Sequence, residues 1–222
     1  MLRIPEPELM LDEDQAVAYA EADFSASDER FVERFKDMFG SLQSGEIIDL
    51  GCGPGNIALR MASAFPGCII TGVDGAAAML DIARKRATAM SGAASRVRFV
   101  ETVLPSSALP MGSAAAVVSN SLLHHLHEPS GLWMTLRQVA ARNAAVLIVD
   151  LRRPETAASA QQIVDTYARD EPEILRQDFY NSLLAAFEVD EVKSQLETAG
   201  LSGLKVQAVG DRYLEVSGRM PG

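Results

Sequence analysis

Short apolar runs alternate with amphipathic segments over most of the chain. The runs predict strands at residues 46–50, 68–73, 96–101, 115–119 and 144–150. Between them, apolar residues recur at helical spacing and predict helices at 56–65, 76–90 and 130–142. Alternation of this kind is typical of a mostly parallel sheet with helices on both faces, so the pattern predicts an α/β fold.

The segment before the first strand predicts helices only. A short one is expected at Asp14–Ala22 and a clearer one at about 28–39. Ser25 with Asp28 three residues later makes a capping pair for the second helix, and Gly40 marks its end.

After the fifth strand the pattern changes again. Residues 155–187 predict two helices broken near Asp170–Pro172, and a further helix is expected at about 190–199. The chain closes on two strands joined by a glycine-containing turn, which predicts an antiparallel hairpin: Lys205–Val209, Gly210-Asp211 and Arg212–Val216.

Composition narrows the class of protein. With 222 residues, 48% of them apolar and 23% charged, the chain suits one globular domain, and no apolar run is long enough to predict a membrane span. The N-terminus lacks an apolar signal core and the two cysteines, Cys52 and Cys68, read as buried small residues, so we expect a cytoplasmic protein. A net charge of −10 argues against a nucleic-acid partner.

A glycine-rich loop follows the first predicted strand. The segment reads Asp49-Leu-Gly-Cys-Gly-Pro-Gly55 and leads directly into a helix. A strand, a tight turn and a helix N-terminus form the usual place for nucleotide-like cofactors in α/β sheets. Asp49 would repel a pyrophosphate, whereas it suits a ligand that carries an ammonium or sulfonium charge.

A second acid stands at the end of the second predicted strand. Asp74 lies 19 residues beyond Gly55, where a carboxylate can accept both ribose hydroxyls of an adenosine.

These pieces resemble the class I S-adenosylmethionine-dependent methyltransferases, of the group that includes the ubiquinone and menaquinone biosynthesis enzymes. The resemblance covers about residues 45–152 and rests on four motifs in family order: Asp49–Gly55, Gly72-Val-Asp74, Ser119–Leu126 and Leu147-Ile-Val-Asp150. It implies a Rossmann-like, seven-stranded sheet with one antiparallel strand. It also implies transfer of a methyl group to a small-molecule acceptor, with S-adenosylhomocysteine as the product.

The resemblance also implies an organisation for the single domain. We expect an N-terminal helical lid at 1–40, a cofactor-binding core at 45–152, a helical insertion at 155–187, and a closing helix and hairpin at 190–219. The oligomeric state and the identity of the acceptor are not specified by these patterns.

Cofactor-binding positions follow residue by residue from the motifs. Asp49 is expected to hold the methionine ammonium and Asp74 the ribose. The expected cofactor-binding residues are Tyr19, Asp49, Gly51, Cys52, Gly53, Asp74, Gly75, Thr102, Val103, Leu104 and Asn120.

One position departs from the family pattern. Related enzymes usually place an acid after the third strand to accept from the adenine amino group, and this chain has Val103 there. The backbone from Thr102 to Leu104 is then expected to contact the adenine ring.

The acceptor end is less defined by sequence. His124 is the preferred candidate for a base or hydrogen-bond partner, and further acceptor contacts are proposed at Arg152, Tyr180 and Asn181. Arg152 and Arg153 could instead pair with nearby acids, and Tyr180 could belong to an apolar core. We predict no metal site, because His124, His125 and His127 cannot all converge on one ion without an unusual turn and no carboxylate stands at matching spacing.

Two other functions are compatible with a nucleotide cleft. Val103 and the absence of an obvious base leave room for a regulatory protein that binds S-adenosylmethionine or S-adenosylhomocysteine without turnover. An NAD-dependent dehydrogenase is disfavoured by Asp49, by Pro54 and by Asn56, which stands where a dinucleotide loop needs glycine or alanine.

Overall fold

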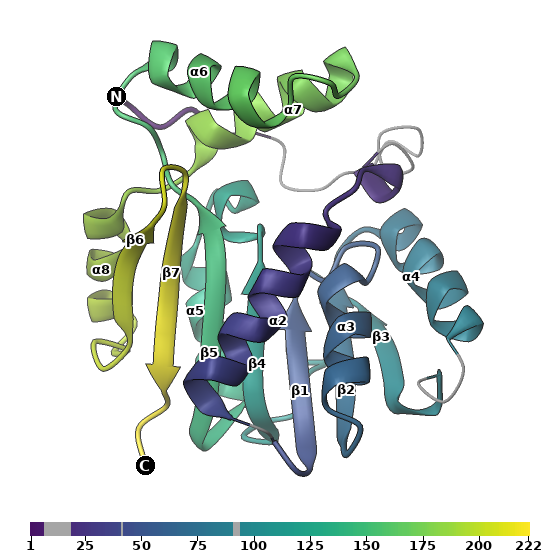
Figure 1. Ribbon diagram of the computed structural model, residues 1–222. Coiled ribbons are helices and arrows are strands. Elements are labelled where there is room, and N and C mark those ends of the chain that lie inside the picture. Colours follow the sequence, from purple (N-terminus) through teal and green to yellow (C-terminus); the bar gives the residue numbers. More distant parts are fainter. Residues whose placement is uncertain (7–18, 41, 91–93) are drawn as a thin grey trace.

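A seven-stranded sheet runs through the protein in the order β3-β2-β1-β4-β5-β7-β6 (Figure 1). The computed structural model describes residues 1–6, 19–40, 42–90 and 94–222. Every neighbouring pair of strands is parallel except the two pairs that contain β7, so the expected reversed strand and closing hairpin are confirmed. The strands are β1 (Gly45–Leu50), β2 (Cys68–Asp74), β3 (Val97–Glu101), β4 (Ala114–Asn120), β5 (Ala140–Leu151), β6 (Lys205–Val209) and β7 (Tyr213–Arg219).

Helices cover both faces of the sheet. The α-helices are α2 (Ser25–Phe39), α3 (Asn56–Ala64), α4 (Ala77–Ala89), α5 (Ser130–Val139), α6 (Ala157–Tyr167), α7 (Glu173–Ala185) and α8 (Val189–Thr198), with short 3-10 turns η1 (Ala94–Arg96) and η2 (Leu123–His125). Within the described ranges, no helix is long and apolar enough to cross a membrane. Of the predicted helix at Asp14–Ala22, residues 19–21 are helical, and residues 14–18 lie outside the described part of the chain.

Alternate residues of the central strands build two separate cores. Ile47 packs with α2 and α3, whereas its neighbour Ile48 packs with α5 and α8 on the opposite face. Val117 and Val118 divide in the same way. Because side chains alternate along a strand, a strand buried on both faces reads as a continuous apolar run, which is how these strands were recognised.

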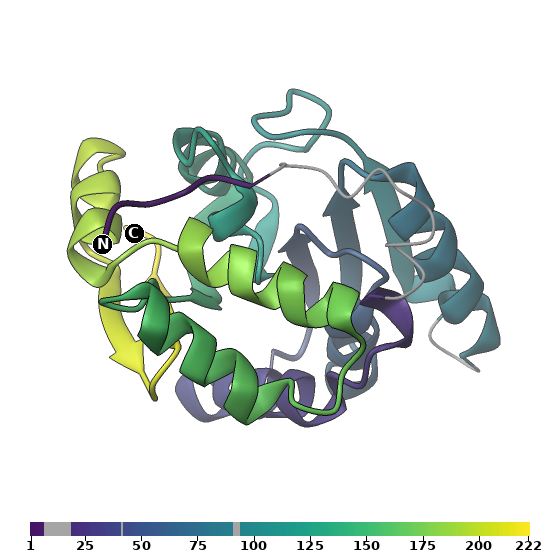
Figure 2. The same cartoon turned by 90° about the horizontal axis from the view of Figure 1, so that it is seen from above.

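Helices α6 and α7 pack on one another above the carboxyl ends of the strands (Figures 1 and 2). The N-terminal residues run alongside α7, where the amide of Ile4 donates to the Leu184 carbonyl at 3.0 Å. The edge of the sheet that carries the motif residues is therefore covered from above by the segment after β5 and by the start of the chain.

Three sequence-based predictions are corrected by the structure. The Ser25–Asp28 capping pair is wrong, because α2 starts at Ser25 and its N-cap residue makes no side-chain capping hydrogen bond. Asp28 is buried instead, and its carboxylate lies 3.4 Å from the Arg60 guanidinium. Helix α5 ends at Val139, and β5 starts four residues before its predicted limit because Ala140 already pairs with β4. Strand β7 continues to Arg219 because it pairs with both β5 and β6, although its apolar pattern ends at Val216.

Candidate functional site

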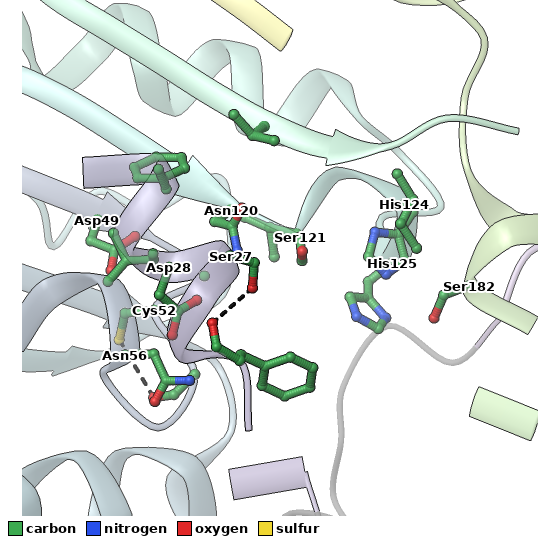
Figure 3. Close-up of a pocket in the computed structure, with 18 of the residues that line it drawn as sticks. Ser27, Asp28, Asp49, Cys52, Asn56, Asn120, Ser121, His124, His125 and Ser182 are labelled. Carbon is green, nitrogen blue, oxygen red and sulfur yellow. Dashed lines mark hydrogen bonds between the residues drawn. The ribbon is translucent and has the colours of Figure 1, made fainter. Parts of the chain in front are cut away.

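A cleft of about 1370 Å³ opens at the carboxyl ends of β1, β2 and β4 (Figure 3). All of the expected cofactor-binding residues line it. So do two of the expected acceptor-binding residues, His124 and Asn181. Parallel α/β sheets place ligands at this edge, so the location agrees with the sequence-based expectation.

The loop between β1 and α3 is shaped by glycine. Gly51 has a φ of 72°, and a Cβ at this position would lie 2.7 Å from a methyl carbon of Leu122. The amides of Gly51 and Cys52 both donate to the Val73 carbonyl of the neighbouring strand, at 2.8 and 2.9 Å. These contacts hold the loop against β2 and keep its inner surface open to a ligand.

Asp49 is the least satisfied polar side chain of the cleft. It is 1% exposed, and neither carboxylate oxygen has a hydrogen-bond partner within the described part of the chain. Burial raises the pKa of Asp49 well above its usual range, and the nearby Asp74 adds to the effect, while the backbone amide of Ala58, whose geometry falls short of a hydrogen bond, opposes it in part. A buried carboxylate without partners is stabilised by a cationic ligand, so this position is suited to an ammonium group.

Asp74 forms the second anchor at the same end of the cleft. Its two oxygens accept from the amides of Gly53 and Ala76, both at 2.8 Å. Burial raises the pKa of Asp74, and the two amides oppose the increase. A carboxylate has lone pairs beyond those two bonds, so Asp74 retains the capacity to accept ligand hydroxyls.

The segment after β3 forms the wall that is expected to face adenine. The Thr102 amide donates to the Asp74 carbonyl at 2.9 Å, and its hydroxyl bonds to Ser106 at 2.7 Å. Val103 is 60% exposed although it lines the cleft, so a large apolar side chain there is left available for contact with a flat ring.

His124 occupies the other end of the cleft and is almost completely buried. Its Nδ1 lies 2.6 Å from Asp150, whose oxygens also accept from the amides of Leu123 and Leu151 at 2.7 and 2.8 Å. Burial alone would lower the pKa of His124, but the carboxylates of Asp150 and Glu6 raise it overall. The ring is therefore held in one orientation by a buried acid.

Glu6 is a site residue that the sequence analysis did not identify. Its carboxylate lies 3.0 Å from His125 Nδ1 and accepts from the Ser182 hydroxyl at 3.0 Å. Burial would raise the pKa of Glu6, whereas His125, His124 and Ser182 lower it overall. Glu6 lies in a proline-containing leader without periodicity, so no local signal in the sequence pointed to it.

Arg3 tethers this leader to the cleft. Its guanidinium donates to the carbonyls of His124 and Leu126 at 2.9 Å, and to the Ala185 carbonyl at 2.5 Å. The same group lies over the Phe187 ring, with 3.9 Å between its central carbon and the ring centroid.

Two of the proposed acceptor contacts lie away from the cleft. Arg152 donates to the carbonyls of Gly210 and Asp211 in the closing hairpin, and Tyr180 packs with the apolar cluster of α6 and α7. Arg153 pairs with two acids at the start of α8, Glu188 at 3.0 Å and Glu191 at 2.8 Å. The structure thus brings His124 and Asn181 to the cleft and leaves Arg152 and Tyr180 outside its lining.

Comparison with known proteins adds a family to this geometry. Residues 47–143 match the model of a methyltransferase domain family. Over 43 residues the chain is 51% identical to a trans-aconitate 2-methyltransferase of Paracidovorax citrulli, a match that covers 19% of this chain and 16% of the relative. The matches to curated relatives span between 16% and 34% of those relatives' lengths.

Solved structures agree over nearly the whole chain. A putative S-adenosyl-L-methionine-dependent methyltransferase from Methanococcus maripaludis superposes with a TM-score of 0.73 at 15% identity, covering 99% of this chain and 98% of that one. A Haemonchus contortus phosphoethanolamine N-methyltransferase, solved with phosphomonomethylethanolamine and S-adenosylhomocysteine, gives 0.71 at 14% identity, covering 95% of this chain and 58% of that one. At such identities the likeness concerns the fold. Residues 47–143 therefore carry a methyltransferase domain, and the fold and the four motifs agree with the class I S-adenosylmethionine-dependent methyltransferases.

Proposed function

We propose that this protein transfers the methyl group of S-adenosylmethionine to a small-molecule acceptor and releases S-adenosylhomocysteine. The observation that carries the proposal is the buried Asp49 carboxylate, which lines the cleft without a hydrogen-bond partner among the described residues. A ligand ammonium placed there would supply the missing positive charge. S-adenosylmethionine carries an ammonium group as well as a ribose, so one ligand could engage both Asp49 and Asp74, which line the same cleft.

The cofactor would lie across the glycine loop. Asp49 would accept from its ammonium and Asp74 from its ribose hydroxyls, while the backbone from Thr102 to Leu104 would face adenine. Asn120, at the carboxyl end of β4, lines the cleft between the two ends and would contact the cofactor through its backbone. Tyr19 lines the same cleft and would cover the bound cofactor from the N-terminal side.

Methyl transfer needs little covalent participation by the protein. The acceptor O, N or C atom forms a bond to the methyl carbon as the S–CH₃ bond breaks, and the bonding electron pair moves to sulfur. The sulfonium already activates the methyl group, so the protein mainly aligns the two partners and excludes water. A proton on the acceptor leaves to a base or to solvent, and His124 is the residue we propose as a base or hydrogen-bond partner.

The charge of the cleft narrows the acceptor class. Eleven acidic side chains line the cleft, against three arginines. A strongly anionic acceptor would meet repulsion there, so a neutral or cationic small molecule with a hydroxyl or amine nucleophile is favoured. The tricarboxylate named for the P. citrulli relative is therefore a weaker candidate for this chain.

Calorimetry and a turnover assay test the proposal together. We expect S-adenosylmethionine and S-adenosylhomocysteine to bind with one-to-one stoichiometry and NADH not to bind. S-adenosylhomocysteine should then accumulate with some members of a panel of small alcohols, phenols and amines, and less with tricarboxylates. Preference for NADH would overturn the assignment, and tight cofactor binding without turnover on any acceptor or cell extract would favour the regulatory alternative.

A further inference from the structure

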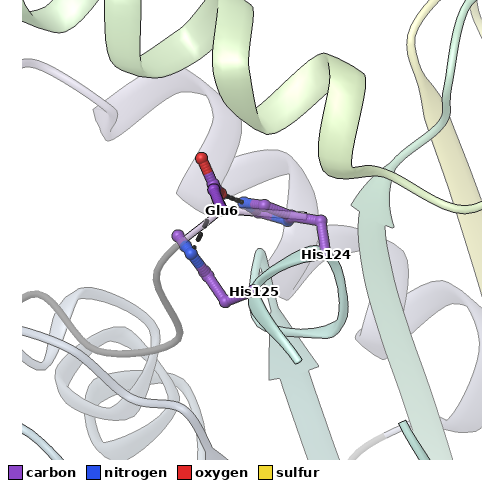
Figure 4. Close-up of side chains that lie close together, drawn as sticks. All are labelled: Glu6, His124 and His125. Carbon is purple, nitrogen blue, oxygen red and sulfur yellow. Dashed lines mark ion pairs between the residues drawn. The ribbon is translucent and has the colours of Figure 1, made fainter. Parts of the chain in front are cut away.

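Three metal-ligating side chains meet where the cleft is expected to hold the acceptor (Figure 4). Glu6 Oε1 lies 3.0 Å from His125 Nδ1 and 3.6 Å from His124 Nε2, and the three ligand atoms are within 4.8 Å of one another. His127 is directed elsewhere, with Nε2 2.7 Å from the Glu6 carbonyl oxygen. Two histidines and a carboxylate that is distant in sequence therefore converge, in place of the three histidines considered from the sequence.

The partner of His124 fixes what its other nitrogen can do. Asp150 accepts two backbone amides, so it acts as the acceptor and the Nδ1–H of the histidine ring donates to it. A neutral ring then presents the Nε2 lone pair toward the Glu6 carboxylate, and two acceptors face each other. A cation between them, either a proton or a metal ion, removes this repulsion.

A buried carboxylate behind a histidine is also the usual support of a metal-ligating imidazole. Such an acid sets the tautomer, orients the ring and increases the basicity of the free nitrogen. Asp150 is 1% exposed and meets this description.

The carboxylate ligand is held in place independently. The Ser182 hydroxyl of α7 donates to Glu6, and Arg3 binds the carbonyls on both sides of His125 in the chain. Residue 6 is thus brought to η2 by contacts that do not involve the histidine rings.

We propose that Glu6, His124 and His125 bind one divalent metal ion of the zinc class. Two imidazole nitrogens and one carboxylate oxygen are a common donor set for zinc, with an open fourth position for water or a substrate atom. Metal–ligand bonds of about 2.0–2.1 Å in a tetrahedron separate the ligands by about 3.3 Å, which lies between the 3.0 and 3.6 Å of the Glu6 pairs. The ion would also hold the N-terminal segment across the cleft.

The role of the ion at the acceptor rests on the proposed methyltransferase function. A hydroxyl acceptor at the open position would lose its proton more readily, because a metal ion lowers the pKa of a bound oxygen. Its oxygen would then attack the methyl carbon, with the proton passing to solvent. His124, with Nδ1 bonded to Asp150 and Nε2 on the ion, would act as a metal ligand in place of the base proposed above.

Metal binding is measured on protein purified without a polyhistidine tag. We expect one equivalent of Zn²⁺ per chain by titration calorimetry and elemental analysis, and visible absorption bands of a tetrahedral site with Co²⁺. Glu6→Gln and His125→Ala should each weaken Zn²⁺ binding at least tenfold and remove the Co²⁺ bands. The control variant Glu197→Gln neutralises an exposed carboxylate on α8 that lies outside the proposed site, and it should bind Zn²⁺ like the wild type.

The outcomes separate this proposal from the proposed function. Binding of S-adenosylhomocysteine and circular dichroism are recorded on the same samples to show that each variant is folded. Absence of stoichiometric Zn²⁺ in the wild type, or equal binding in Glu6→Gln and His125→Ala, would overturn the metal site even if the cofactor binds normally. If the wild type instead shows no metal and a histidine that titrates with the loss of the Glu6 contact, the cation is a proton and the proposal is wrong.

Discussion

The acids at the two ends of the cleft differ in their hydrogen-bond partners and in the direction of their pKa shifts. At the cofactor end, Asp49 is buried and its carboxylate has no hydrogen-bond partner within the described ranges. At the acceptor end, Glu6 is contacted by His124, His125 and Ser182. The pKa values follow this difference, since burial leaves the pKa of Asp49 raised, whereas the neighbours of Glu6 outweigh burial and lower its pKa.

The difference indicates what each end requires from a ligand. Burial disfavours the ionised form of Asp49. A cationic ligand that reaches this carboxylate stabilises its ionised form, so the charge of the ligand contributes to the binding free energy. At Glu6, the side chains of His125 and Ser182 already donate hydrogen bonds to the carboxylate. A ligand at this end must either displace these side chains from Glu6 or, like a metal ion, bind Glu6, His124 and His125 together.

Replacement of Asp49 tests the first half of this contrast and should have the largest effect. Asp49→Asn removes the charge that would hold the ammonium, and we expect affinity for S-adenosylhomocysteine to fall by about 1.5–3 kcal/mol, the usual contribution of a hydrogen bond to a charged group. The ligand-free protein should become more stable, because an unpartnered buried carboxylate is removed. Calorimetry and thermal denaturation with and without ligand measure both effects.

Asp81→Asn is the matched control, because Asp81 is an exposed aspartate on α4 that pairs with Arg84. This substitution should change neither the affinity for S-adenosylhomocysteine nor the stability of the ligand-free protein. Undiminished affinity in Asp49→Asn would show that the unpartnered carboxylate does not face the ligand.

Asp74 tests whether the same end also holds the ribose. Asp74→Ala should weaken S-adenosylhomocysteine binding by about 1–3 kcal/mol, because ligand hydroxyls are left unpaired. Loss of the bonds to Gly53 and Ala76 would also loosen the loop, so affinity alone does not isolate the ribose contact. A 2′-deoxyribose analogue of the ligand does isolate it.

The wild type should prefer the natural ligand over this analogue, and Asp74→Ala should lose the preference. Equal discrimination in both proteins would remove Asp74 from the ribose site and leave it as a support for the loop.

Asp28 is another buried acid that lines the cleft, and its raised pKa should make the stability of the protein depend on pH. Burial raises the pKa of Asp28 to about 6, although Arg60 opposes the shift. Because the folded state then binds the proton more tightly than the unfolded state, stability should fall as pH rises from about 4 to about 6 and should stay reduced above that range. Asp28→Asn should remove this loss and increase the free energy of unfolding at pH 7.5 by about 1–2 kcal/mol.

Chemical denaturation of both proteins between pH 4 and pH 8 measures the difference. The curves should approach each other toward pH 4 and separate between pH 4 and pH 6. A constant difference across the range would indicate that Asp28 titrates near its ordinary pKa.

The contrast between the two ends also explains how far sequence analysis could reach. Asp49, the glycine loop and Asp74 lie on adjacent strands and close in sequence, so local patterns predicted both their elements and their meeting point. Glu6, His125 and Ser182 come from distant segments, and their meeting depends on how the leader runs beside α7.

Some predictions for individual side chains were wrong for related reasons. Asp28 has the spacing of a helix cap, but its side chain is buried and lies 3.4 Å from Arg60. The end of β7 was missed because its later residues include Ser217, a polar side chain that is buried and bonded to Glu215. Polar residues with tertiary partners carry no periodic signal, and the apolar pattern therefore predicted the sheet better than the site.

The smallest expected effect is a gain at the adenine wall. Val103→Asp would place a carboxylate where related enzymes accept from the adenine amino group, and Val103 is exposed enough that the fold should tolerate the change. We expect S-adenosylhomocysteine to bind about 0.5–1.5 kcal/mol more tightly, the usual contribution of one hydrogen bond. Val103→Thr, which keeps the shape without the acid, should show no gain, and neither should a ligand with hypoxanthine in place of adenine. If Val103→Asp binds the hypoxanthine ligand equally well, the new carboxylate acts through the general charge of the cleft, and the segment from Thr102 to Leu104 does not read the adenine edge.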